Sequence, residues 1–403
     1  MKFCRTWLYL WKIYRTRVDC MKVIVLVLLV ILVIVLQDRI LRRTATRKLD
    51  YECRFSKQEA YEGEILYLQE TVQNRKFLPV PWLKVDIHTS CWLDFAGTNS
   101  VVTQSGRRVS SSFVLGARKK VIRNWKVLCL KRGLFTIENV TFVWGDLLGT
   151  SNSSAAKSVK SSLMVYPSPV NLENILVPLN YLQGDTIVKR LIIDDPFLVS
   201  GIREYSGYDP MNRIHWQATA KAGRLMVKKN DFTSQHKIQV ILNIQSSEYE
   251  FDEVFDKPMI ELGIKVAATV FDRAHRLGIP ISFNCNGCLY DTPDKTIQTD
   301  IEAGNQHFQR LMKILAMLEL KKVVDFDNFI SDFENRSGDS EIIVITSYIN
   351  DNIFNAIRKI GRFRNNLKIF ILDRCVSTKG IPGDMDVYIL NGTEDYAINE
   401  KKH

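Results

Sequence analysis

The sequence lacks the motifs by which many enzymes are recognised. It contains no G-x-S-x-G nucleophile elbow, no G-x(4)-G-K-[ST] phosphate-binding loop and no H-E-x-x-H zinc motif. Only 6 histidines occur among 403 residues, and none forms an H-x-H pair. Low-complexity tracts and periodic repeats are also missing. The sequence therefore predicts a protein that is not an enzyme, uses no cofactor and has no evident small-molecule substrate.

The 8 cysteines are scattered and do not have the spacing of a small disulfide-rich domain. Cys285 and Cys288 form a lone C-x-x-C, whereas a zinc site would need a second pair at similar spacing. The Asn286-Gly287 dipeptide between them predicts a tight turn with two neighbouring thiols. Scattered cysteines suit a reducing compartment.

The net charge of +11 is concentrated at the N-terminus. Residues 1–48 hold eleven Lys and Arg against two Asp, a net +9, which leaves +2 for the other 355 residues. Basic residues on both sides of one hydrophobic segment suit anionic lipid headgroups. Since no basic groove is indicated in the rest of the chain, no nucleic-acid partner is expected.

That hydrophobic segment, Val23–Leu36, is a continuous apolar run. Extended to residues 20–37 it would be a helix of about 27 Å, close to the ~30 Å hydrocarbon core of a bilayer. Asp38 and Arg39 follow it instead of a signal-peptide cleavage site. We therefore predict an uncleaved single-pass anchor in the cell membrane. The short basic tail argues for a soluble part outside the cell, but the cysteines favour the cytoplasmic face, which we prefer.

Residues 49–165 have the pattern of an all-β domain. Leu83, Val85 and Ile87 alternate with polar residues, as in a strand with one solvated face, and Trp125, Val127 and Cys129 repeat this pattern. Turn-forming glycines separate such segments, and no helical period lies between them. The pattern predicts a small antiparallel sandwich.

From residue 237 to 395, short apolar runs alternate with helical patterns. One such pattern, Ile260–Ala274, is closed by Gly278 and Pro280. This alternation predicts a largely parallel, doubly wound sheet. The predicted fold class is thus α+β multidomain: a transmembrane helix within residues 1–48, a β-sandwich-like domain, a linker and signature segment over residues 166–236, the α/β domain, and a tail over residues 396–403.

The segment Ser200–Lys229 interleaves charged residues with large apolar ones. Burying charge is costly unless it is paired, so the segment predicts a fixed polar network, either a structural ion-pair lattice or a partner-binding surface. Tyr205 and Trp216 would be its anchors, while Arg203 and Arg213 would clamp nearby carboxylates. The candidate interaction residues are Arg203, Glu204, Tyr205, Asp209, Arg213, His215, Trp216, Lys221 and Lys228.

The run R-E-Y-x(3)-D-x(3)-R-I-H-W-x-A-T-A-K-x-G-x-L-M-V, from Arg203 to Val227, resembles the signature of the domain of unknown function 58 family. Glu62–Leu83 and Lys131–Gly149 agree with it, although Tyr208 stands where the family commonly has glycine. The resemblance covers roughly residues 49–390. It implies a membrane-anchored protein with a von Willebrand factor A-like C-terminal half. It also implies association with a MoxR-type AAA+ ATPase in protein-complex assembly or maturation.

Von Willebrand factor A-type domains often hold Mg²⁺ through a D-x-S-x-S loop and a later Thr. The corresponding residues here are Asn243, Gln245, Ser247 and Thr346. Because a hard cation prefers anionic oxygen ligands, this degenerate site predicts no functional metal. The leading hypothesis is a non-catalytic, membrane-anchored protein-interaction module. The alternative is a cell-envelope ligand-binding protein that uses a metal-dependent A-type domain.

Overall fold

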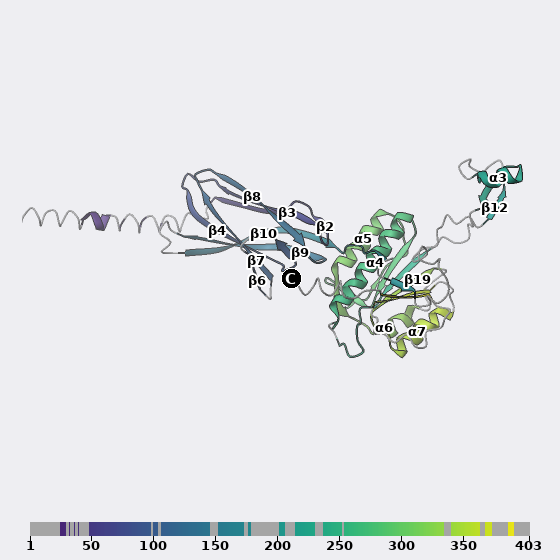
Figure 1. The fold of residues 1–403 in the computed structure, drawn as a ribbon. Coiled ribbons are helices and arrows are strands. Elements are labelled where there is room, and N and C mark those ends of the chain that lie inside the picture. The colour runs from purple at the N-terminus through teal and green to yellow at the C-terminus, as the bar shows by residue number, and fades with distance from the viewer. Residues whose placement is uncertain are drawn as a thin grey trace, which may run out of the picture. The chain divides into compact units, whose positions relative to one another are not determined.

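The chain divides into two compact units, Met1–Val165 and Tyr166–His403, and each is described by itself (Figure 1). The computed structural model describes residues 25–29, 32, 36, 39, 48–97, 100–103, 106–145, 152–172, 176–178, 201–205, 214–229, 237–251, 254–333, 340–362, 367–372 and 386–390.

The first unit is a β-sandwich of two antiparallel sheets. One sheet has the strand order β1-β3-β8-β5 and the other the order β2-β10-β9-β4-β7-β6. The strands are β1 (Leu49–Phe55), β2 (Glu59–Tyr61), β3 (Ile65–Asn74), β4 (Val80–Thr89), β5 (Leu93–Phe95), β6 (Ser100–Thr103), β7 (Gly106–Leu115), β8 (Lys120–Cys129), β9 (Gly133–Gly145) and β10 (Asn152–Tyr166). Inward-facing residues of both sheets share one hydrophobic core.

The alternation seen in the sequence explains these strands. Leu83, Val85 and Ile87 are buried in β4, and Val127 and Cys129 are buried in β8, so both predicted strands are confirmed. Apolar side chains on alternate positions face the second sheet, which removes them from water and stabilises the pairing of the two layers.

A polar cluster lies inside this apolar core. Glu70 of β3 is fully buried and accepts hydrogen bonds from the Tyr51 hydroxyl (3.1 Å), the Ser111 hydroxyl (2.9 Å) and the Trp125 indole N–H (3.1 Å). Burial raises the pKa of Glu70, although the three donors oppose this effect. Burial also raises the pKa of the nearby Cys53 thiol to about 12. The sandwich thus contains one carboxyl group whose removal would leave several donors without an acceptor.

The second unit is built on a seven-stranded sheet with the order β11-β21-β20-β19-β14-β15-β17. Five neighbouring strands, from β21 to β15, run parallel, while β11 and β17 are antiparallel at the two edges. The strands are β11 (Leu176–Pro178), β14 (Ile238–Leu242), β15 (Ile281–Cys285), β17 (Ile297–Gln298), β19 (Glu341–Thr346), β20 (Leu367–Ile371) and β21 (Asp386–Leu390).

Four helices pack on this sheet: α4 (Lys257–Leu277), α5 (Asn305–Met317), α6 (Phe326–Phe333) and α7 (Asp351–Arg362). Helices α4 and α5 lie together on one side, and α6 and α7 on the other (Figure 1). Asp256 caps the start of α4 by accepting from the Met259 N–H. Gly278 ends the helix in the left-handed conformation, which confirms the predicted helix end. Phe271 of α4 meets Phe283 of β15 edge to face at 5.5 Å.

Two small sheets complete the second unit. Strands β12 (Gly201–Glu204) and β13 (Met226–Lys229) pair antiparallel, and helix α3 (Trp216–Ala222) lies between them in the sequence. Strands β16 (Gly287–Leu289) and β18 (Leu318–Lys322) pair in the same way. The latter sheet joins the chain after β15 to the chain before α6.

The fold class predicted from the sequence is wrong in its transmembrane helix and its doubly wound half, whereas its β-sandwich-like domain is present. The described elements are mostly β-strands in five sheets, with few helices. The predicted doubly wound, von Willebrand factor A-like half is not seen in that form, because the second sheet is mixed, with antiparallel strands at both edges. The reason at one edge is that no helix lies between β15 and β17. A parallel neighbour would need a long crossover connection, which is usually helical.

The predicted location as a single-pass membrane protein is likewise corrected. Among the described residues, no helix combines the length and the apolar character needed to cross a bilayer. Of the predicted anchor over residues 20–37, residues 25–29, 32 and 36 are described and are helical, and the others lie outside the described residues.

Candidate functional site

The candidate site lies at the carboxyl edge of the parallel strands. The strand order reverses at β14, because β15 lies on one side of it and β19 on the other. In open sheets of this kind, ligands bind outside the carboxyl ends of the strands at such a reversal. The segments that follow β14 and β19 meet there.

These segments are joined by a network of neutral hydrogen bonds. The Asn243 amide donates to the Thr346 hydroxyl (3.0 Å), and the Thr346 hydroxyl donates to the Tyr348 carbonyl (2.7 Å). The Gln245 N–H donates to the Asn243 side-chain oxygen (2.9 Å), and the Gln245 amide donates to the Ser247 carbonyl (2.9 Å). The structure therefore brings together the four residues of the degenerate metal site identified in the sequence.

This arrangement does not fit a divalent cation. Asn243 and Gln245 each direct an amide N–H at an oxygen atom, and an N–H group cannot bind a cation. A hard ion would need anionic oxygens in their place. Within the described residues, no three His, Cys, Asp or Glu side chains come together as a possible metal site. The network instead fixes the ends of two strands.

Asn243→Asp tests this interpretation. A carboxylate at position 243 would supply an anionic oxygen in place of the amide N–H and would place it beside the Thr346 hydroxyl oxygen, a second oxygen ligand. We expect the variant to gain affinity for Mg²⁺ or Mn²⁺. At a concentration ten times the dissociation constant, the ion would then stabilise it by about 1.4 kcal/mol. Thermal melting with and without each ion measures this. A shift of equal size in the unmodified protein would contradict the interpretation.

The loop after this network is held by Glu250. Its carboxylate is buried and accepts from the backbone N–H groups of Ser246 and Phe255, each at 2.8 Å, and from the Ser246 hydroxyl. The Ser246 hydroxyl also accepts from the Asp256 N–H (3.0 Å), which ties the loop to the start of α4. Glu250 therefore acts as an internal brace that fixes the described ends of the loop.

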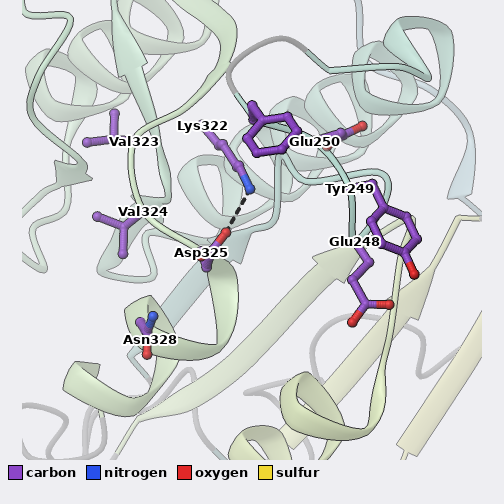
Figure 2. A pocket seen from close by; sticks show the side chains of 9 residues that line it. Glu248, Tyr249, Glu250, Lys322, Val323, Val324, Asp325 and Asn328 are labelled. Carbon is purple, nitrogen blue, oxygen red and sulfur yellow. Dashed lines mark hydrogen bonds and ion pairs between the residues drawn. The ribbon is translucent and has the colours of Figure 1, made fainter.

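Beside the loop lies a pocket of about 720 Å³. Figure 2 shows Val323, Val324 and Asn328 on one side and Glu248 and Tyr249 on the other. Between them the Lys322 ammonium pairs with the Asp325 carboxylate at 2.7 Å. The residues that line the pocket are Glu248, Tyr249, Glu250, Phe251, Lys322, Val323, Val324, Asp325 and Asn328.

The braced loop presents three aromatic side chains to solvent. Tyr249 is 77% exposed, Phe251 91% and Phe255 71%. Single exposed apolar residues are common on protein surfaces, but here three large exposed aromatic residues lie within seven positions of the chain and two of them line the pocket. Sequence reasoning missed them. The available signal was the aromatic-rich run from Tyr249 to Phe255, which begins seven residues after the buried strand β14 ends.

The predicted interaction residues occupy the β12–α3–β13 segment. His215 caps α3 by accepting from the Ala218 N–H (3.2 Å). The Glu204 carboxylate pairs with Arg224 (2.7 Å). Trp216 is 69% exposed, so it is not an anchor that buries a large area among the described residues. The Tyr205 N–H donates to the Leu225 carbonyl (2.9 Å).

The remaining predicted interaction residues contribute less. Lys221 is exposed in the last turn of α3. Arg203 and Lys228 lie on the paired strands β12 and β13. Asp209 and Arg213 lie outside the described residues, as do the side chains of Arg203 and Lys228. The described part of this segment includes the exposed Glu204–Arg224 ion pair, and the ion-pair lattice and the partner-binding surface both stay predictions.

No family model matches the chain. No curated protein matches it in sequence. Solved structures similar to part of it include the CARDB domain of the PF1109 protein from Pyrococcus furiosus, with 11% identity over 30% of this chain and 97% of that one and a TM-score of 0.20. A non-cellulosomal cohesin from Archaeoglobus fulgidus is 11% identical over 29% of this chain and 91% of that one, with a TM-score of 0.20. Likenesses this weak carry no argument about partner or activity.

Proposed function

We propose that this chain is a non-catalytic protein-interaction module that receives a partner protein at the carboxyl edge of its seven-stranded sheet. The observation that carries the proposal is the exposure of Tyr249 and Phe251 in the lining of the pocket, with the exposed Phe255 four residues further along the chain. Aromatic side chains are enriched in protein interfaces and dominate their binding energy.

The brace at Glu250 supports the proposal in a second way. Holding the ends of a loop before the partner arrives reduces the conformational entropy lost on binding. The carboxylate of Glu250 is occupied by its hydrogen bonds to Ser246 and Phe255, which suits a structural role better than proton transfer. The site is therefore better suited to hold a surface than to carry out a reaction.

The partner is proposed to be a MoxR-type AAA+ ATPase acting in protein-complex assembly or maturation. This part of the proposal depends on the resemblance of the segment from Arg203 to Val227 to the domain of unknown function 58 family. Binding to such an ATPase would couple nucleotide hydrolysis to remodelling of a complex that contains this protein.

Phe251→Ala should weaken the complex with the MoxR-type ATPase of the same organism by about tenfold, close to 1.4 kcal/mol. The reason is that truncation removes an exposed aromatic contact without touching the core. Titration calorimetry on the full-length chain measures this, with the ATPase tested in both its active form and a form blocked in ATP hydrolysis.

Tyr290→Ala is the matched control, because Tyr290 is 75% exposed but follows β16, at the far end of its pairing with β18 from Lys322. The Tyr290→Ala variant should bind the ATPase with the affinity of the unmodified chain. Absence of binding to either form of the ATPase would refute the proposed partner. Equal losses in the two variants would refute the proposed surface.

A further inference from the structure

The pocket beside the aromatic loop carries unbalanced negative charge. Its charged lining residues are three carboxylates, Glu248, Glu250 and Asp325, and one ammonium group, that of Lys322. Lys322 is paired with Asp325, and Glu250 is occupied by its three donors. Glu248 is exposed and has no hydrogen bond or ion pair within the described residues. Glu248 is thus the carboxylate left to meet a ligand.

The negative charge extends beyond the pocket lining. Tyr348, which follows β19, has a raised pKa, first because of burial and then because of the carboxylate of Glu248, with smaller contributions from Tyr249 and Asp327. Glu248 and Asp327 therefore lie close enough to act on the same hydroxyl group. A surface with this excess of carboxylates attracts cations and repels anions.

The aromatic side chains add a second preference. Tyr249 and Phe251 line the same pocket as Glu248 and are largely exposed. A cation placed over an aromatic ring is attracted by the electrons of the ring, and arginine does this more often than lysine because its guanidinium group is planar and weakly hydrated. A guanidinium group can also form two parallel hydrogen bonds to one carboxylate.

We infer that this pocket is a binding site for an arginine-bearing segment of the partner protein, with the guanidinium group paired to Glu248 and stacked on Tyr249 or Phe251. This inference rests on the proposed function and specifies the chemistry of the partner. The volume of about 720 Å³ exceeds the needs of one guanidinium group and suits a short peptide segment. Acidic segments and nucleic acids would be repelled.

The test uses the full-length chain and three fluorescein-labelled peptides of the same length. The first repeats Arg-Gly-Leu, the second has citrulline in place of arginine, and the third has glutamate. Citrulline keeps the shape of the arginine side chain and removes its charge. We expect the arginine peptide to bind and the citrulline and glutamate peptides to bind at least about tenfold more weakly, as fluorescence anisotropy would measure. Added salt should weaken the binding of the arginine peptide and of neither other peptide.

Glu248→Gln should lower the affinity for the arginine peptide by about threefold to fivefold, as expected for the loss of a partly solvated ion pair. Asp300→Asn is the control, because Asp300 is also exposed but lies beside the start of β15, at the opposite edge of the sheet. Its affinity should not change. Both variants should melt at the temperature of the unmodified chain, which would show that the fold is intact.

The outcomes separate this inference from the proposed function. If Phe251→Ala weakens the ATPase complex while Glu248→Gln changes neither ATPase nor peptide binding, the interaction surface stands and the arginine site is refuted. Equal binding of the arginine and citrulline peptides also refutes it. If the arginine peptide binds and depends on Glu248 while no ATPase binds, the arginine site stands and the proposed partner is wrong.

Discussion

Glu70→Ala should lower the free energy of unfolding of the β-sandwich unit by about 3–5 kcal/mol. The substitution removes the acceptor shared by the Tyr51 hydroxyl, the Ser111 hydroxyl and the Trp125 indole N–H, and it leaves a cavity in a fully buried position. Urea unfolding followed by tryptophan fluorescence measures the loss, since four of the 7 tryptophans lie within residues 49–165.

Glu70→Gln is the matched control, because glutamine keeps the volume and one acceptor oxygen. It replaces the second oxygen by an NH₂ group, so one of the donors loses its partner, and we expect a loss of only about 1–2 kcal/mol. If the alanine and glutamine variants were equally stable, the hydrogen bonds to Glu70 would contribute nothing measurable to the fold.

The pH dependence of the unfolding free energy, compared between the unmodified chain and Glu70→Gln, tests the protonation of Glu70 independently. Burial raises the folded-state pKa of Glu70 above its ordinary value of 4.5, so the folded chain holds this proton more tightly than the unfolded chain does. The stability that this proton contributes is fully present below pH 4.5 and is lost as pH rises through the raised pKa. The difference in unfolding free energy between the unmodified chain and Glu70→Gln should therefore fall over that window. A difference that stays constant would show that the pKa of Glu70 is not raised.

The strand that contains Glu70 shows which features of the sandwich can be predicted from the sequence and which cannot. In β3, Leu66, Leu68 and Val72 are buried at alternate positions, and Glu70 occupies the inward position between them. The alternation alone would have placed Glu70 in the core, but a glutamate is ordinarily exposed. Its three donors come from strands distant in the sequence, and no local pattern specifies that meeting.

In the second unit, too, features set by local sequence were predicted and features set by contacts between distant residues were not. Helix α4 and its end at Gly278 follow from the spacing of apolar residues and from one glycine, so both were predicted. The antiparallel edge strand β17 was not predicted, because its pairing depends on the connection after β15. The pocket was missed because Glu248 and Lys322 are separated by more than seventy residues and meet only when β14 and β18 are in place.

Asn286 links the two loops that form the pocket. The second large loss of stability that we expect arises at the residue next to it, Gly287. Its fully buried side chain accepts from the Ile244 N–H (2.9 Å) and donates to the Val324 carbonyl (3.2 Å). The next residue, Gly287, also lies against Ile244. A Cβ atom there would overlap the Ile244 Cδ1 atom and would lie 3.2 Å from the Lys321 carbonyl oxygen. The site therefore has no room for a methyl group.

Gly287→Ala should accordingly lower the free energy of unfolding of the second unit by about 3 kcal/mol, the upper end for overpacking of a close-packed core. Ile244 is fully buried and lies two residues after the end of β14, so its displacement would also disturb the loop that carries Tyr249. Binding of the arginine peptide should weaken together with stability. Urea unfolding followed by circular dichroism, together with peptide anisotropy, measures both effects.

Gly278→Ala is the control for Gly287→Ala, because it strains the backbone without crowding the residues beside the pocket. Gly278 has φ +68° and nothing within 4 Å of an added Cβ atom, so alanine there should cost only about 1 kcal/mol for its left-handed conformation. Peptide binding should be unchanged, because Gly278 is not among the residues that line the pocket. If Gly287→Ala instead retained full stability, Ile244 would have a second rotamer available. The pocket wall would then be adaptable, and Glu248 and Tyr249 could not hold a guanidinium group in one geometry.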